Sequence, residues 1–266
     1  MKISIITATW NSAETLRNTM DSVLGQTYQD FEHIIVDGMS KDCTMDLIHI
    51  YEPNYQGRLR YISEPDNGIY DAMNKGIRMA AGDIIGILNS DDFYTSSDVL
   101  EKVVARMERN DIDALYGDIH YVAATNLSKC VRYYSSKHFH RRWMRLGFMP
   151  AHPSFYCRKN IYTDFGMFNT TYHVAADFEN LLRLIYIRHI RTAYLPMDFV
   201  TMRMGGASTS GIKSHRQIMK EHLRALKTNG IYSNVALLSL RYLYKVYEIA
   251  KTRLQNFFPD TTRKKV

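Results

Sequence analysis

The chain has 266 residues, of which 45% are apolar and 23% are charged, as in an ordinary globular protein. This length permits one large domain, and no stretch approaches the roughly 18 apolar residues of a membrane span. The net charge of +7 is unevenly placed: residues 213–266 hold 12 Lys and Arg against 3 Asp and Glu, whereas residues 1–212 hold 22 against 24. We therefore expect a domain over 1–212 that does not bind nucleic acid, followed by a basic extension over 213–266.

The cysteines and the first residues indicate the compartment. Cys43, Cys130 and Cys157 are far apart and lack the spacing of a metal site, so we expect reduced thiols. The apolar run after Met1 is too short for a signal peptide. The sequence predicts a cytoplasmic protein.

The first part of the chain alternates between short apolar runs and amphipathic segments. The runs predict buried strands over residues 2–8, 31–36, 59–63 and 84–88. The segments between them predict helices over residues 13–24, 43–51 and 69–80. This alternation is typical of an α/β fold, with a mostly parallel central sheet flanked by helices.

Acidic residues follow three of these predicted strands: Asp37, Asp66 and the pair Asp91-Asp92. Open α/β sheets bind their ligands at the carboxyl ends of strands, so we expect these side chains to face one site. Two adjacent carboxylates repel each other, and a bound divalent cation would relieve that repulsion, so Asp91-Asp92 could be a cation site. The alternative interpretation of this pair is a solvated turn that caps the next helix. A dinucleotide-binding Rossmann site is disfavoured, because the turn at 7–12 contains no glycine.

Five segments of the chain together resemble the motifs of one known family. Residues 5–11 (IITATWN), 22–32 (SVLGQTYQDFE), 36–44 (VDGMSKDCT), 64–76 (EPDNGIYDAMNKG) and 82–92 (GDIIGILNSDD) occur in this order. They resemble the bacterial family-2 glycosyltransferases of GT-A fold, densely over the first hundred residues and more thinly to about residue 210. The resemblance implies a nucleotide-sugar half over 1–118 and an acceptor half over 119–212.

The resemblance also implies roles for individual residues. The donor, for which we expect a UDP-sugar, would be bound by residues at the strand ends and in the following turns: Thr7, Ala8, Thr9, Asn11, Asp37, Asp66, Gly68, Asn74, Asn89 and Ser90. Asn89 stands where the family often has a first aspartate. A divalent cation, Mn²⁺ or Mg²⁺, would therefore rest mainly on Asp91, with Asp92 in support.

The middle of the chain predicts a helix over 97–109, a strand over 114–118, and a hairpin of 119–122 with 130–134. Residues 137–147 are rich in His, Arg and aromatic side chains, which favours either a solvated loop or a flap that meets an anionic acceptor. His152, between two prolines, is either a turn residue or a contact to the diphosphate or acceptor.

Asp177 opens a predicted helix whose buried face is formed by later leucines. In the first turn the helix dipole favours an ionised carboxylate, ready to accept a proton; its alternative role is that of a cap. Glu179 points to a different side of the helix. Asp177 matches the catalytic base of the resembling family, with Ala176 in place of a first acid. Since the Q-x-x-R-W motif of processive synthases is absent, we expect a single inverting addition.

The extension predicts helices over 213–228 and 232–257, after a glycine-rich segment at 202–211 that could close over the donor. The last helix has an apolar stripe flanked by cations at Arg241, Lys245, Lys251 and Arg253. It could lie on an anionic membrane, pack on the domain, or pack on a second subunit in a homodimer.

Together these features predict an inverting, metal-dependent transfer of one sugar to a saccharide hydroxyl. By resemblance, the acceptor is a lipid-linked saccharide of a bacterial surface polysaccharide, met at the inner face of the cytoplasmic membrane. A scaffold that binds nucleotide-sugars without transfer is the main alternative, although such a binder has no use for Asp177. A nucleotidyltransferase is disfavoured by the missing glycine-rich, basic loop after the first strand.

Overall fold

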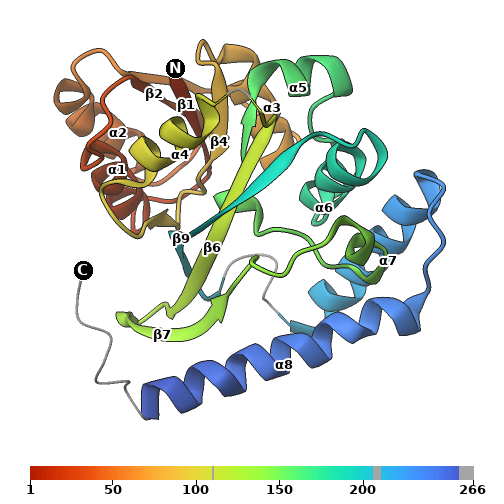
Figure 1. The fold of residues 1–266 in the computed structure, drawn as a ribbon. Helices are drawn as coiled ribbons and strands as arrows, with labels where there is room; N and C mark the ends of the chain where they lie inside the picture. The colour runs from red at the N-terminus through yellow and green to blue at the C-terminus, as the bar shows by residue number, and fades with distance from the viewer. Residues whose placement is uncertain (110, 206–210, 258–266) are drawn as a thin grey trace.

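The computed structural model describes residues 1–109, 111–205 and 211–257. Its centre is a nine-stranded sheet of order β3-β2-β1-β4-β8-β6-β9-β5, with β7 paired to β6 (Figure 1). Four parallel strands form one side of it: β1 (Ile3–Thr9), β2 (Phe31–Asp37), β3 (Leu59–Ser63) and β4 (Ile84–Ile87). Their carboxyl ends therefore meet at one edge, as the sequence predicted.

The other side of the sheet is mixed. The predicted strand 114–118 and the first hairpin strand form one long strand, β6 (Ala114–Ala123), which continues into the hairpin with β7 (Asn126–Tyr134). The sequence predicted neither of the two strands that join at the far side, β9 (Thr192–Arg203), which is parallel to β6, and β5 (Phe93–Tyr94). The short β8 (Tyr156–Arg158) runs antiparallel to β4 and β6 and so joins the two sides.

Helices cover both faces because side chains alternate along each strand. In β1, Ile3 and Ile5 pack in one buried cluster, whereas Ile6 and Ala8 pack in the other. The first cluster is completed by α1 (Leu16–Leu24), α2 (Thr44–Tyr51) and α4 (Val99–Met107). The second is completed by α3 (Ile69–Met79), α5 (Lys159–Phe165) and α6 (Ala176–Leu181). These layers confirm the predicted α/β class.

Short helical turns connect these elements. Three are 3₁₀ turns, and a π-helical turn continues α6; they are η1 (Glu52–Tyr55), η2 (Arg141–Leu146), η3 (His152–Ser154) and η4 (Leu182–Ile187). The predicted flap at 137–147 thus contains η2, whose Met144 is buried in the core.

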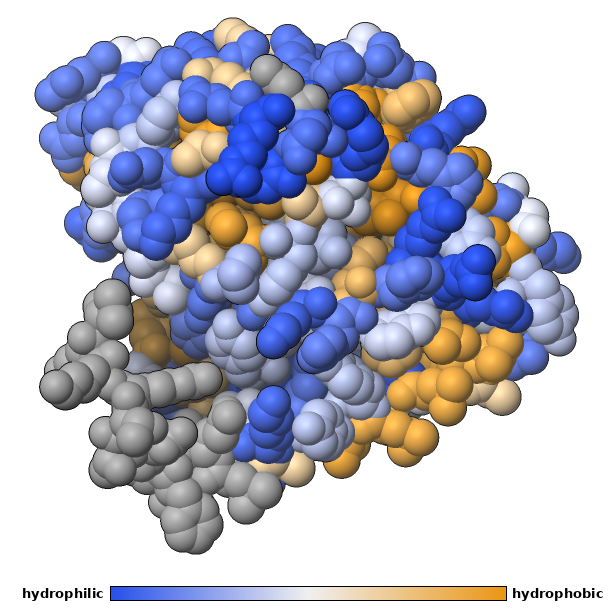
Figure 2. Space-filling model, in the orientation of Figure 1, coloured by the Kyte–Doolittle hydropathy of each residue, from blue (hydrophilic) through white to orange (hydrophobic). Residues whose placement is uncertain are grey.

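The extension forms α7 (Gly211–Thr228) and α8 (Val235–Phe257), and α8 lies along β7 and η2 (Figure 1). Leu238 is buried in the second cluster, and Arg132 of β7 pairs with Glu248 of α8. One face of α8 is therefore packed on the domain. Its other face exposes apolar residues, including Leu243 at 70%, and Figure 2 shows hydrophobic side chains gathered over the first half of this helix.

Two expectations for the C-terminal part can be compared with the structure. Of the segment predicted to close over the donor, residues 202–203 belong to β9 and residues 206–210 lie outside the described part of the chain. No helix among the described residues is long and apolar enough to cross a membrane.

Candidate active site

The turns that follow β1 and β2 are tied to each other. The Asn11 side-chain oxygen accepts a hydrogen bond from the Lys41 amide at 2.8 Å, and the Asn11 amide donates to the Ser40 hydroxyl, also at 2.8 Å. Asn11 and Met39 both have left-handed backbones, with φ of 48° and 60°, which is uncommon outside glycine and clusters at functional sites. Asn11 is therefore well placed to shape a binding edge.

Asp37 is buried at the end of β2, where its carboxylate is fully hydrogen bonded. It accepts a hydrogen bond from the Ser40 amide at 3.0 Å and another from the Ser63 hydroxyl at 2.6 Å. Because these partners come from the ends of both β2 and β3, Asp37 is held rigidly between the two turns. Asp37 thus lies at the carboxyl edge of the parallel strands, and its role next to a nucleotide stays a prediction.

Trp10, Gly38 and Asp66 form a shallow surface beside Asp37. A side-chain carbon added to Gly38 would come within 2.6 Å of the Asp66 carboxylate and 3.5 Å of the Trp10 ring. Asp66 also accepts a hydrogen bond from the Gly68 amide at 2.8 Å, which begins α3. Trp10 is 66% exposed. The sequence reasoning did not single it out, although an exposed aromatic ring beside carboxylates can stack a base or sugar.

Three residues of the predicted donor site are used inside the protein instead. The Thr7 hydroxyl donates to the Leu88 carbonyl at 2.7 Å, and Ala8 is buried in the core. The Asn74 side chain exchanges two hydrogen bonds with the backbone of Phe168, at 2.8 and 2.9 Å. We therefore leave Thr7, Ala8 and Asn74 out of the donor site considered below. Thr9 differs, because its buried hydroxyl has no partner among the described residues.

The turn after β4 contains the two adjacent carboxylates. Asp92 is buried and accepts a hydrogen bond from the Asn89 side-chain nitrogen at 3.0 Å. Within the described chain, the second oxygen of Asp92 and the side-chain oxygen of Asn89 have no partner. Burial raises the pKa of both Asp91 and Asp92, and the Asp91 charge raises that of Asp92 further. The Ser90 hydroxyl lies 3.0 Å from that of Ser12, which links this turn to β1.

Two unpartnered oxygens and two carboxylates that disfavour each other's charge fit an oxygen-ligated divalent cation. No three His, Cys, Asp or Glu side chains gather as a metal cluster in the part of the chain that the structure describes. A cation here would therefore need further ligands from a substrate or from water.

Arg203, the last residue of β9, supports this turn, and the sequence reasoning missed it. Its guanidinium donates to the Asp91 carbonyl and to the Asn18 side chain, each at 2.9 Å, and lies over the Phe93 ring. Arg203 is 112 residues from Asp91 in sequence, so no local pattern could have indicated the contact. It brings a fixed positive charge to the carboxylate pair.

Asp177 lies at the start of α6 and has two side-chain neighbours. Its Oδ1 accepts a hydrogen bond from the Phe178 amide at 2.8 Å and one from the Tyr70 hydroxyl at 3.4 Å. Its Oδ2 lies 3.4 Å from Nδ1 of His152. Glu179, the competing carboxylate, points away and pairs with Arg183 at 3.1 Å. The structure thus separates the two acids as the sequence predicted.

His152 connects the two acidic sites. Burial lowers the pKa of His152, while the charges of Asp177 and Asp91 act in the opposite direction. Its imidazole therefore faces the predicted base and also lies within electrostatic range of the predicted cation site. Burial and the Asp177 charge raise the pKa of Tyr70, which keeps its hydroxyl a hydrogen-bond donor.

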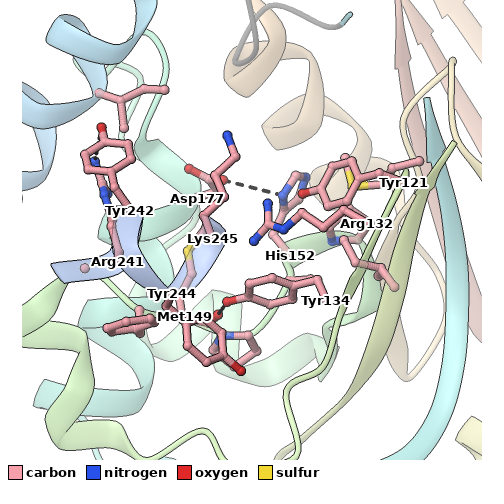
Figure 3. A pocket seen from close by; sticks show the side chains of 18 of the residues that line it. Tyr121, Arg132, Tyr134, Met149, His152, Asp177, Arg241, Tyr242, Tyr244 and Lys245 are labelled. Atoms are coloured by element: carbon pink, nitrogen blue, oxygen red, sulfur yellow. Dashed lines mark hydrogen bonds and ion pairs between the residues drawn. The ribbon is translucent and has the colours of Figure 1, made fainter. Parts of the chain in front are cut away.

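A cavity of about 280 Å³ opens in front of Asp177 and His152 (Figure 3). Its remaining walls come from several elements, and those from β7 and α8 include three cationic side chains: Arg132, Arg241 and Lys245. The site thus has carboxylates at the strand ends, a carboxylate–histidine pair in the middle, and cations on the far wall.

Comparisons with known proteins identify the family and the fold. Residues 4–174 match the model of glycosyl transferase family 2. A "PGL/p-HBAD biosynthesis glycosyltransferase" of Mycobacterium bovis (strain BCG / Pasteur 1173P2) is 33% identical over 224 residues, which are 84% of this chain and 83% of that protein.

Two solved structures share the fold at low sequence identity. TarS of S. aureus superposes with a TM-score of 0.63 and 16% identity; the match covers 98% of this chain but only 44% of TarS. The mannosyltransferase PcManGT of Pyrobaculum calidifontis, in complex with GDP-Man and Mn²⁺, has a TM-score of 0.62 and 14% identity, over 97% of this chain and 87% of PcManGT. These matches confirm the predicted GT-A fold, and the chain belongs to glycosyl transferase family 2.

Proposed function

We propose that the protein transfers one sugar from a nucleotide-diphospho-sugar to a hydroxyl of a saccharide acceptor, with inversion at the anomeric carbon. The observation that carries this proposal is the position of His152, which faces Asp177 directly and lies within electrostatic range of Asp91. The proposed base for the acceptor and the proposed site for the donor diphosphate would therefore lie on either side of His152. Family membership supports the reaction class.

In the proposed step, the acceptor oxygen attacks the anomeric carbon while Asp177 accepts the hydroxyl proton. The bond from the anomeric carbon to the diphosphate oxygen breaks, and the nucleoside diphosphate leaves with that electron pair. The Phe178 amide and the Tyr70 hydroxyl orient one oxygen of Asp177, which leaves the other oxygen beside His152. Positioning of the two substrates supplies the rest of the acceleration.

Asp91, with Asp92 and Asn89 beside it, would hold Mn²⁺ or Mg²⁺, because a buried oxygen of Asp92 and one of Asn89 lack partners in the described chain and the two carboxylates disfavour each other's charge. A bound cation supplies charge neutralisation for the departing diphosphate. Arg203 contributes a second, permanent positive charge at the same turn. The Mn²⁺ complex of PcManGT supports this assignment.

The donor is proposed to be a UDP-sugar, bound by the shallow surface of Trp10, Gly38 and Asp66 next to Asp37. Solved structures of the same fold include complexes of TarS with UDP-GlcNAc and of PcManGT with GDP-Man. For the acceptor we propose a lipid-linked saccharide of a bacterial surface glycan. The name of the mycobacterial relative, a PGL/p-HBAD biosynthesis glycosyltransferase, is consistent with a role in glycan biosynthesis. The exposed apolar face of α8 suits contact with the inner face of the cytoplasmic membrane.

The decisive experiment removes the proposed base. Incubation of the protein with a panel of nucleotide-sugars and Mn²⁺ or Mg²⁺ should reveal one donor that is slowly hydrolysed. Asp177→Asn should lower that rate by about 10³-fold while donor affinity changes little, because only proton transfer is lost. Asp164→Asn, an exposed carboxylate on α5, serves as the matched control and should keep the rate. Near-normal turnover in Asp177→Asn would refute the base, and donor binding without turnover in the unmodified protein would indicate a scaffold.

A further inference from the structure

The far wall of the cavity carries three cations that the proposed chemistry does not use. Arg132 comes from β7, and Arg241 and Lys245 come from adjacent turns of α8. Figure 3 shows Arg132 and Lys245 pointing into the space in front of Asp177 and His152. The sequence left open whether the helix that carries Arg241 and Lys245 lies on a membrane, packs on the domain or packs on a second subunit, and in the structure both residues line this cavity.

The neighbours of these cations leave a positive excess. Arg132 pairs with the buried Glu248, at 2.5 Å, and lies over the rings of Tyr121 and Tyr134. Arg241 donates a hydrogen bond to Nδ1 of His222 at 2.6 Å and forms no ion pair with a carboxylate among the described residues.

Lys245 differs from the two arginines in its contacts. It makes no hydrogen bond or ion pair with any residue that the structure describes, although it is only partly exposed. Burial and the charges of Arg132 and Arg241 lower the pKa of Lys245, while Glu248 acts in the opposite direction. Within the described chain, Glu248 is close enough to act on this half-buried ammonium group but already pairs with Arg132, so Lys245 has no counter-ion of its own there.

A second cavity, also of about 280 Å³, continues from the first. It is mainly apolar, and its walls include Phe139, Trp143, Leu146 and Leu240. Four residues line both cavities: Tyr134, Phe148, Met149 and Tyr244. The order along this path is therefore the carboxylate of Asp177, then the cations, then an apolar pocket between η2 and α8.

We propose that the two cavities form one acceptor subsite for a phosphate ester that carries a hydrocarbon chain. The phosphate lies against Lys245, Arg132 and Arg241, and the chain occupies the apolar pocket beside Trp143. The saccharide attached to the phosphate then reaches Asp177. Because the cations and Asp177 line one small cavity, the sugar that is extended lies close to the phosphate. This inference rests on the proposed function, since it assumes that Asp177 meets the acceptor.

The charge of the site favours this ligand over the alternatives. A neutral lipid would leave Lys245 without a counter-ion, and an anion without a chain would leave the apolar pocket unfilled. A charge-assisted hydrogen bond from a partly buried ammonium group contributes strongly to phosphate affinity, whereas an exposed lysine contributes little.

The two tryptophans of the chain allow a direct binding test. In a Trp10→Phe background, Trp143 is the only tryptophan and reports on the apolar pocket. Dodecyl phosphate, used below its micelle concentration, should change Trp143 emission in a saturable way. Dodecanol, which lacks the charge, and inorganic phosphate, which lacks the chain, should each bind at least about tenfold more weakly.

Variants of α8 then test the charge. Lys245→Met should weaken dodecyl phosphate binding by about tenfold or more and leave dodecanol binding unchanged, and Lys245→Arg should restore most of the affinity. Lys251→Met removes an exposed cation from the same helix and should have no effect. Circular dichroism checks that each variant is folded.

Three results would overturn the inference: no change of Trp143 emission, equal binding of dodecanol and dodecyl phosphate, or equal effects of Lys245→Met and Lys251→Met. Inorganic phosphate that binds as tightly as dodecyl phosphate would also overturn it and would indicate a site for a free anion. Failure here is distinguishable from failure of the proposed function. Donor hydrolysis that depends on Asp177, in a protein that ignores dodecyl phosphate, would keep the glycosyltransferase reaction and remove only this subsite.

Discussion

The nucleotide-sugar half and the acceptor side of this molecule are built in different ways. Around the donor edge, the turns after neighbouring strands are tied to one another, as in the contacts of Asn11 with the turn after β2 and of Ser90 with Ser12. On the acceptor side, the main contacts join distant segments: Arg132 pairs with Glu248, 116 residues later, and the Tyr133 amide donates to the Thr252 hydroxyl, 119 residues later.

This difference separates two functions. The donor edge depends on strand ends that the parallel sheet brings together, so its residues occur in compact motifs. The acceptor cavity depends on where α8 packs, and its lining residues share no motif. Under the proposed function, donor binding depends on one region and acceptor preference on another. The following changes test that division, from the largest expected effect to the smallest.

Asp91→Asn should have the largest effect of these changes. It should lower the rate of donor hydrolysis without destabilising the fold. We expect the rate of donor hydrolysis to fall by about 10³-fold, since a charged ligand of the proposed cation is lost. Stability should be unchanged or higher, because the repulsion between Asp91 and Asp92 is removed. Hydrolysis rates at several Mn²⁺ concentrations and a thermal unfolding curve measure both quantities. Asp30→Asn, an exposed carboxylate, is the control; equal rates for the two variants would place the cation elsewhere.

Leu238→Ala should destabilise the packing of α8 on the domain. Leu238 is fully buried, and one of its methyl groups lies within 3.0 Å of where a side-chain carbon on Gly147 would stand. Removing the side chain should lower the free energy of unfolding by about 3 kcal/mol. Leu243→Ala, at a position 70% exposed on the same helix, should change it by less than about 0.5 kcal/mol. Denaturant unfolding measures these changes. UDP binding followed through Trp10 should survive in the folded Leu238→Ala protein, and its loss would contradict the separation of the two regions.

Gly76→Ala should weaken the nucleotide-sugar half. An added carbon on Gly76, in α3, would come within 2.3 Å of the Ile6 side chain in β1, so helix and strand would have to move apart. We expect a loss of about 2 kcal/mol of unfolding free energy, measured in urea. Arg78→Ala, an exposed change on the same helix, should stay within about 0.5 kcal/mol of the unmodified protein. A neutral Gly76→Ala would mean that α3 is less closely packed than described.

Acid should destabilise both regions gradually, with the smallest change at each pH unit. Burial lowers the pKa of His33 in β2 to about 3, and it lowers the pKa of His222 in α7 as well. Between the ordinary value of 6.5 and these lowered values, the unfolded chain binds protons that the folded chain does not. Stability is therefore full above pH 6.5 and falls as the pH drops, by up to about 1.4 kcal/mol per pH unit for each histidine.

Urea unfolding between pH 7.5 and pH 4.5 measures that slope. His33→Gln should reduce the slope of unfolding free energy against pH by about 1.4 kcal/mol per pH unit, which corresponds to one proton. His49→Gln, at an exposed position, should leave the slope unchanged. A slope that His33→Gln does not change would show that His33 is protonated in the folded protein.

Much of the nucleotide-sugar half could be predicted from sequence, because its signals are local. The strand over 59–63 agrees with β3, and Asp37, Asp91 and Asp177 lie where the strand and helix patterns put them. The polar residues of the motifs were harder to interpret. A motif does not reveal which side of a strand a residue faces, and Thr7 and Asn74 turn out to hydrogen bond inside the protein.

The parts that could not be predicted depend on contacts between distant residues. Tyr194, near the start of β9, donates a hydrogen bond to the buried Asp118 of β6, a contact across 76 residues. The contact of Arg203 with the Asp91 carbonyl depends on the same strand. The direction of Arg241 and Lys245 depends on how α8 is rotated on β7, and α8 is apolar on both faces. Its periodicity alone could not identify the face that packs inward.

The packing of α8 has a consequence for how acceptor preference can change. Most of the cationic wall and part of the apolar pocket are carried by a single helix near the end of the chain, and the matched family region ends at residue 174, before this helix begins. A chimaera that exchanges this helix with that of a relative would present a new acceptor surface to an unaltered donor site. The C-terminal helix thus offers a route by which one catalytic framework can diversify the glycans it builds.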